Sequence, residues 1–389
     1  MKMANPLTAI AVALIMVLAG GNAIAEEQIK IGGLFDLSGP ASFFGKPSRL
    51  VATMAVDHIN KEGGINGKPV TLLIADTKGR PSRAAQIARA FISKEKVIAL
   101  IGPTRTSSGL AIKQIVREAR VPTYMTVDGD PVISDDPRMD YSNWVFKAPP
   151  PASVAIRRIY LYMNKKGFTR IAIMTAANGY GKHGARWLKK LAPDYDLKIV
   201  AAETFSHEAT NLVPQLTRAK NARPDALVVW TMSRAGLTVI ADKARMGIDL
   251  PLFQCQDLTD PRYIRLAGRA AEGDRLPATK LMVADELSDT DPQKALIREF
   301  INLYRRYGYD KRFPINTHTA YAWDAVMILA NALSKSGTKT VDLRTALEKT
   351  RGFVGISGIY NLSSRDHNGL DVGSMVMVQV KNGKFAIAK

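Results

Sequence analysis

The amino-terminal part of the chain alternates between the two hydrophobic periods of a strand–helix–strand unit. Residues 29–35 form a nearly continuous apolar run, which the Gly/Pro-containing segment 36–40 ends. Apolar residues at helical spacing follow over 50–59, and the pair 63–64 is Gly-Gly. A second apolar run covers 70–74. This order predicts a βαβ unit of an open α/β sheet.

The loop after the first strand is a candidate ligand site. In open α/β sheets, backbone N–H groups and the start of the next helix converge at such a loop and favour anionic groups. Ser38 lies in this loop. We therefore take Ser38 as a candidate binding residue.

Five short motifs mark this unit, namely Ser38-Gly39-Pro40, Phe44-Gly45, Ile59-Asn60, Gly63-Gly64-Ile65 and Gly67-Lys68-Pro69. They resemble the pattern of the type I periplasmic substrate-binding proteins of ABC transporters, in the branch for branched-chain amino acids. The resemblance covers essentially the whole mature chain. It implies an α/β fold of two Rossmann-like lobes, which a three-segment hinge joins, with the ligand in the cleft.

The first 25 residues have the pattern of an export signal. Lys2 precedes an uncharged apolar run over 7–18, and Ala23-Ile24-Ala25 has the small-x-small form of a signal-peptidase site. The apolar run is shorter than the roughly 20 residues that a membrane-spanning helix needs, although an anchor is the alternative. We expect cleavage after Ala25 and a periplasmic mature protein.

Composition limits the classes of function. The 389 residues suffice for two domains, and the single cysteine, Cys255, cannot form an intramolecular disulfide. A net charge of +19 would suit nucleic acid, but the basic residues are scattered and lack interleaved aromatics. The five histidines show no metal-ligand spacing, and G-x-S-x-G and P-loop patterns are absent. We expect a monomer that is not an enzyme and has no nucleic-acid partner, metal or cofactor.

Three passages predict where the chain passes between lobes. A proline run follows the strand-like segment 143–147 and suits a first crossover. The resemblance places the return after residues 270–273, as an extended stretch through Met282-Val283, and the tail 355–389 crosses back as strands. The expected lobes are residues 26–147 plus about 281–354, and residues 148–280 plus about 355–389.

In the first lobe, the hydroxyl-rich loop 104–109 opens a helix. Ser and Thr at a helix start usually serve as caps. The resemblance implies that the family's carboxylate-binding Ser/Thr corresponds to Thr106, with Ser107 and Ser108 beside it. Ser38, Arg105 and Thr106 together could hold a carboxylate.

The next predicted strand, 121–127, ends differently from the family pattern. The amino-acid binders have a short Ser-x-Ala-Thr-like turn there, whereas this chain has Asp128-Gly129. Val127 and Gly129 can offer only backbone groups to a ligand. Asp128 would repel a carboxylate unless its side chain points away, which weakens the expectation of an α-amino acid.

The resemblance implies further contacts from four residues. Tyr180 corresponds to an aromatic that lies over the ligand, and Asp257, give or take one position, to an acid that pairs with a ligand amino group. A helix N-cap is the alternative for Asp257. His318 falls near an aromatic contact, with a capping or surface histidine as its alternative. Phe44, Tyr180 and His318 would offer flat apolar walls.

These features together predict a solute-binding protein that closes about a hinge and is then recognised by a membrane permease. The expected ligand is a branched-chain or other hydrophobic amino acid. Aromatic or other organic carboxylates, or amides, are the alternative. A module that senses a ligand for a membrane receptor is the second class of function.

Overall fold

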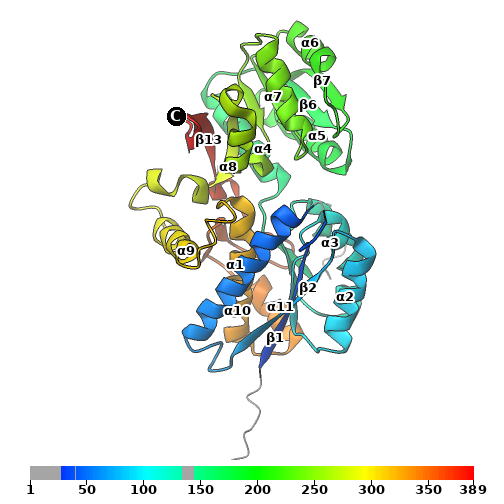
Figure 1. Cartoon of the computed structure of the whole chain (residues 1–389), viewed down its shortest axis with the longest axis vertical. Coiled ribbons are helices and arrows are strands. Elements are labelled where there is room, and N and C mark those ends of the chain that lie inside the picture. Colours follow the sequence, from blue (N-terminus) through cyan, green and yellow to red (C-terminus); the bar gives the residue numbers. More distant parts are fainter. Residues whose placement is uncertain (1–27, 40, 134–143) are drawn as a thin grey trace, which may run out of the picture.

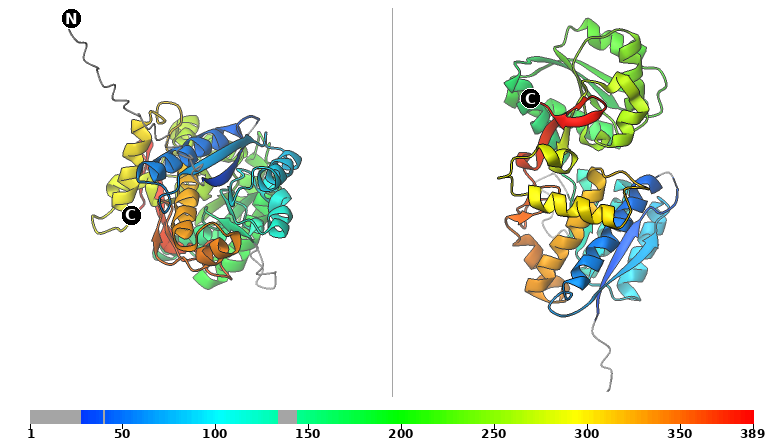
Figure 2. Two further views of the ribbon diagram at one scale, coloured as in Figure 1. Left: turned by 90° about the horizontal axis from the view of Figure 1, so that it is seen from below. Right: turned by 60° about the vertical axis from the view of Figure 1, so that its left-hand side comes forward.

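The computed structural model describes residues 28–39, 41–133 and 144–389, which form two lobes one above the other (Figure 1). The views in Figure 2 agree on this division. The predicted leader, residues 1–25, lies outside the described residues. Within the described part of the chain, no helix combines the length and the apolar character needed to cross a membrane.

The first lobe is built on a sheet in which every strand pair is parallel. The predicted strand over 121–127 is shorter than expected and includes only three residues. The strands lie in the order β2 (Val70–Asp76), β1 (Ile29–Phe35), β3 (Ala99–Ile101), β4 (Thr123–Met125) and β5 (Val145–Lys147).

Helices cover both faces of this sheet, because each face carries apolar side chains that must be buried. The two faces form separate apolar cores. The βαβ prediction is confirmed, and its helix begins eight residues earlier than the apolar pattern, at Ser42. One layer holds α1 (Ser42–Lys61), α9 (Lys294–Arg306), α10 (Thr317–Ser336) and α11 (Thr340–Glu348), and the other holds α2 (Pro81–Ser93) and α3 (Thr106–Ala119).

The second lobe is a mixed sheet of seven strands. The tail joins it, as expected, through two antiparallel strands that turn at Asn382-Gly383. The strands lie in the order β14 (Lys384–Ile387), β13 (Met375–Lys381), β10 (Arg275–Thr279), β9 (Leu252–Gln254), β8 (Ala226–Trp230), β6 (Arg170–Ala176) and β7 (Lys198–Phe205).

Two helical layers also cover the second sheet, each with its own apolar core. One core lies beneath α4 (Ala152–Lys165) and α5 (Gly179–Leu191). The other lies beneath α6 (Val213–Asn221), α7 (Ala235–Arg245) and α8 (Pro261–Ala267).

The chain passes between the sheets after β5, after β10, and after the short hairpin of β11 (Phe353–Val354) and β12 (Ile359–Tyr360). The expected extended stretch is present over β10 but ends at Thr279, because the 3-10 element η5 (Lys280–Glu286) follows, with a kink at the non-helical residue Val283. Leu281 and Ala284 of η5 lie in the core of the first lobe, and Val283 lies in a core of the second. The exact lobe boundaries stay a prediction.

Side chains join the lobes near the first crossover. Lys147 and Asp130 are both buried, and Lys147 Nζ lies 2.9 Å from Asp130 Oδ1. Asp130 Oδ2 accepts a hydrogen bond from the N–H of Ala152 (3.0 Å) and lies 2.9 Å from His183 Nε2 on α5. One carboxylate of the first lobe therefore holds three groups at and beyond the crossover.

The stability of the second lobe is expected to depend on pH because the carboxyl group of Asp274 is buried. Burial raises the pKa of Asp274 to about 7, although the Tyr263 hydroxyl, which donates to Asp274 Oδ2 at 2.8 Å, opposes the rise. This folded pKa exceeds the unfolded value of 3.8, so folding favours the protonated carboxyl. The free energy of unfolding is therefore highest at low pH and falls as pH rises toward 7. Asp274→Asn keeps an acceptor for Tyr263 and should raise the free energy of unfolding at pH 8 by about 3 kcal/mol.

Urea denaturation at pH 4, 6 and 8 checks this expectation. The gain from Asp274→Asn should be small at pH 4 and complete at pH 8. Asp249→Asn, an exposed position of the same lobe, is the control and should change little at any pH. A gain of equal size at pH 4 and pH 8 would show that the carboxyl does not titrate as described.

Candidate functional site

The candidate site lies where loops at the carboxyl ends of strands in both lobes meet. Asp128 follows β4, and His318 is in the first turn of α10, both in the first lobe. Asp257 lies in the 3-10 helix η3 (Gln256–Leu258), which follows β9, and Tyr180 lies in the first turn of α5. Such edges carry the ligands of open α/β sheets because the chain there is free of the sheet's own pairing.

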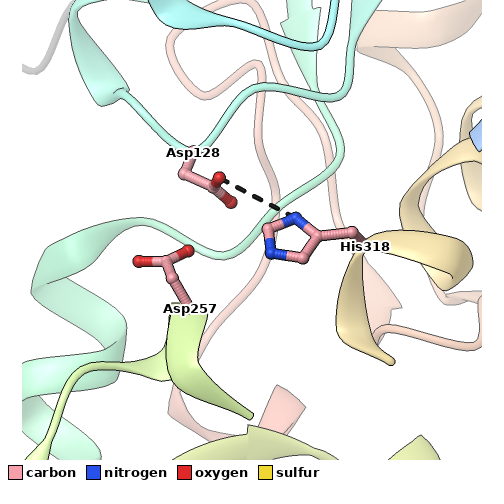
Figure 3. A group of neighbouring side chains, drawn as sticks. All are labelled: Asp128, Asp257 and His318. Atoms are coloured by element: carbon pink, nitrogen blue, oxygen red, sulfur yellow. Dashed lines mark ion pairs between the residues drawn. The ribbon is translucent and has the colours of Figure 1, made fainter. Parts of the chain in front are cut away.

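Three of these residues form a compact cluster across the cleft (Figure 3). Asp128, Asp257 and His318 each offer an atom, and these atoms lie within 4.8 Å of one another. His318 Nδ1 is 3.9 Å from Asp128 Oδ2. Asp128 thus points into the cleft, where it would oppose a carboxylate, and not away from it. Two carboxylates and an imidazole are also donors that divalent metal ions accept.

The cluster has unused acceptor capacity. Among the described residues, Asp128 Oδ1, Asp257 Oδ1 and His318 Nε2 are buried without a hydrogen-bond partner. The other oxygen of Asp257 accepts the hydroxyl hydrogen of Tyr180. Burial, and then the negative charge of Asp128, raise the pKa of Asp257 well above its usual value. The cluster is therefore suited to a cationic group that donates hydrogen bonds.

The two alternative readings of Asp257 and His318 as capping residues are wrong. Asp260 is the N-cap of α8, where its side chain accepts from Arg262 N, and Asn316 is the N-cap of α10. His318 is not a surface residue either, because only 6% of it is exposed. Burial without a capping role leaves both side chains directed at the cleft.

Aromatic rings flank the cluster. The Phe44 ring lies 4.3 Å from the His318 ring, measured between centroids. Tyr180 stacks on Trp230 at 6.0 Å, with 17° between the ring planes. The two lobes thus each contribute flat apolar walls.

The residues expected to hold a carboxylate are arranged differently. Ser38 is exposed, and its hydroxyl donates to Asp76 Oδ2 at 2.6 Å. Arg105 and Ser107 are exposed at the start of α3. No hydrogen bond or ion pair between described residues joins these three to the cluster. They remain predictions as binding residues.

Thr106 and Gly129 contact one another. Thr106 Oγ1 accepts the N–H of Gly129 at 3.2 Å, so this backbone donor is already used. A Cβ on Gly129 would lie 2.3 Å from Thr106 Cγ2, which explains why the position has no side chain. Val127 is buried in a core of the first lobe, and only its backbone could reach a ligand.

A groove that the sequence did not reveal extends from Asp257 between α7 and α8. We call it the α7–α8 groove; its volume is about 690 Å³. Three large apolar side chains on its walls are exposed, namely Phe43 (45%), Met232 (37%) and Leu266 (69%). Met232 lies two residues after the end of β8, so its place in a carboxyl-end loop was the available signal. Leu266 gave none, because it continues a helical pattern.

Comparison with known proteins gives concordant matches. The family model described as periplasmic binding protein matches residues 28–384. Leu/Ile/Val-binding protein homolog 7 of Brucella abortus (strain 2308) is 25% identical over 239 residues, which are 59% of this chain and 58% of that protein. This chain thus spans less than two thirds of that relative. Leu/Ile/Val-binding protein BraC3 of Rhizobium johnstonii is 22% identical over 315 residues, which are 81% of each.

Among solved structures, similarity extends over nearly the whole chain. The branched-chain amino acid transporter substrate binding protein LivJ of Streptococcus pneumoniae, solved in complex with isoleucine, superposes with a TM-score of 0.76. It is 25% identical, and the match covers 93% of this chain and 99% of that one. The two-lobed α/β architecture is therefore the one that this chain shares with a solved solute-binding protein.

Proposed function

Because this chain belongs to the periplasmic binding protein family, we propose that it is the solute-binding component of an ABC transporter. It captures a small organic solute in the periplasm and delivers it to a membrane permease. The names of the relatives favour a hydrophobic amino acid, of the Leu/Ile/Val type, as the first candidate for the solute. Members of this family bind solutes and are not enzymes.

The observation that carries the proposal is the pairing of charge and aromatic surface across the cleft. Asp257, with an unpartnered buried oxygen, accepts hydrogen bonds from the solute's ammonium group. Phe44 and Tyr180, on opposite lobes, contact its apolar part. Asp128 points into the same space, which disfavours the alternative of an organic carboxylate without an amino group.

Binding in this place drives hinge closure. A solute that contacts Asp257 of the second lobe and Phe44 of the first binds the closed arrangement more tightly than an open one. That difference in affinity is what shifts the equilibrium between the two. The closed form is the species that the permease recognises.

A thermal-shift screen of the mature protein, residues 26–389, tests the proposal with amino acids, aromatic acids and amides. One class should raise the melting temperature progressively, because a ligand at 100 times its Kd stabilises by about 2.7 kcal/mol. Small-angle scattering should show a smaller radius of gyration with that ligand. If no compound shifts the transition, the solute-binding proposal loses its support.

A further inference from the structure

The cluster limits what can lie beside the solute's ammonium group. Asp128 and Asp257 approach from opposite lobes, and each has a buried oxygen without a partner among the described residues. In an α-amino acid the carboxylate is one carbon away from the ammonium group. An ammonium bound to Asp257 would therefore hold that carboxylate against Asp128, and like charges held so close disfavour binding.

A peptide avoids this conflict because its amino terminus is followed by a neutral amide. Its carboxylate lies at least one residue further on, about 3.8 Å from Cα to Cα. The space for such an extension exists, since the α7–α8 groove begins at Asp257. Its volume of about 690 Å³ lies in the range of pockets that hold drug-sized ligands, about 300–1,000 Å³.

The walls of the groove are suited to apolar side chains. Phe43 of the first lobe and Leu266 of the second face it while 45% and 69% exposed. Leu237 and Tyr263 line it between α7 and α8. Covering such apolar surface favours binding in proportion to the area removed from water.

A cation for the far carboxylate lies in the same groove. Arg234 is exposed at the N-cap of α7 and lines the groove. Its guanidinium group makes no hydrogen bond or ion pair to the residues that the structure describes. The neighbouring Arg262, in contrast, is paired with Asp260. The start of α7 adds positive potential beside Arg234.

We infer that the solute is a short apolar peptide whose amino terminus binds between Asp128 and Asp257, with its side chains in the α7–α8 groove and its carboxylate at Arg234. This inference rests on the proposed function and specifies its ligand class. Asp128, where the chain departs from the family pattern, is then the residue that favours peptides over single amino acids.

Calorimetry of the mature protein with leucine, Leu-Leu, N-acetyl-Leu-Leu and Leu-Leu amide tests the inference. Leu-Leu should bind at least about tenfold more tightly than leucine, because a second side chain is buried. Acetylation, which removes the ammonium charge, should weaken binding about 100-fold. If leucine binds as tightly as Leu-Leu, or if none of the four compounds binds, the peptide assignment is wrong. The proposed function fails only if the thermal-shift screen also finds no ligand.

Two variants locate the peptide in the groove. Arg234→Ala should weaken Leu-Leu about fivefold and leave Leu-Leu amide unchanged. Leu266→Ser should weaken Leu-Leu and leave leucine unchanged. Both side chains are exposed, so folding should be unaffected, and Lys220→Ala on α6 is the matched control. If Arg234→Ala weakens the binding of Leu-Leu and of Leu-Leu amide equally, the peptide carboxylate does not contact Arg234.

The titrations are run with EDTA, because the same cluster has donors for a divalent ion. Binding of Leu-Leu that persists in EDTA supports an ammonium group in the cluster. Binding that instead requires an added divalent cation would overturn this assignment.

Discussion

Replacing Asp130 by alanine is expected to lower the free energy of unfolding by about 3 to 5 kcal/mol, the cost of breaking a buried ion pair. Lys147 Nζ, 2.9 Å from Asp130 Oδ1, is fully buried and would lose the carboxylate that pairs with it. The N–H of Ala152 and the ring of His183 would lose their acceptor as well. Because Asp130 and His183 belong to different lobes, the variant also loosens the first crossover.

The cost of Asp130→Ala should depend on pH, because Asp130 stabilises the fold only when it is charged. Burial alone would raise its pKa, but the charges and hydrogen bonds of Lys147 and His183 outweigh burial and lower it. A lowered folded pKa means that the stabilisation is present above the unfolded value of 3.8 and is lost as pH falls through the folded pKa. The difference in the free energy of unfolding between the original protein and Asp130→Ala should therefore become smaller in strong acid.

Guanidinium or thermal denaturation measures the effect, with a surface ion pair as the control. Arg218 Nη2 lies 2.7 Å from Glu203 Oε2, a distance similar to that of the buried pair, but Arg218 is 56% exposed. Glu203→Ala should cost less than about 1 kcal/mol. Adding Lys147→Met to Asp130→Ala should recover part of the loss. Comparable costs at Asp130 and Glu203 would refute the account of a buried charge.

Asp257→Ala is expected to weaken the binding of a solute with a free amino group by about 100-fold, the size expected for a buried charged hydrogen bond. Asp257 is 5% exposed, and its Oδ1 has no partner among the described residues. Removal of the carboxylate leaves the ammonium group without its acceptor. Calorimetry with leucine, phenylalanine and Leu-Leu measures the change.

The matched controls separate charge from general disruption. Asp249→Ala removes an exposed carboxylate of the same lobe and should leave binding unchanged. Tyr180→Phe keeps the ring on Trp230 and removes only the hydroxyl that donates to Asp257, so its effect should be smaller. A hydroxybenzoate that binds tightly to both the original protein and Asp257→Ala would instead favour the organic-carboxylate alternative.

Much of this architecture could be predicted from local sequence patterns. Apolar periodicity over 29–74 predicted the strand, helix and strand that the structure contains, because burial on one face constrains residues close in sequence. The same reasoning placed Tyr180 and Asp257 just after the carboxyl ends of strands, and the structure has them there, in the first turn of α5 and in η3. The resemblance to a family then supplied the two-lobed arrangement that short-range patterns do not contain.

Only the tertiary structure decided what those loops bring together. Asp128, Asp257 and His318 come from three separate elements, so no spacing along the chain relates them. The sequence left the direction of the Asp128 side chain open, and the structure shows it directed at His318. The α7–α8 groove likewise arises where α1 meets α7 and α8. Periodicity reports that a side chain is buried or exposed, but not which distant surface it faces, because that depends on how the lobes pack.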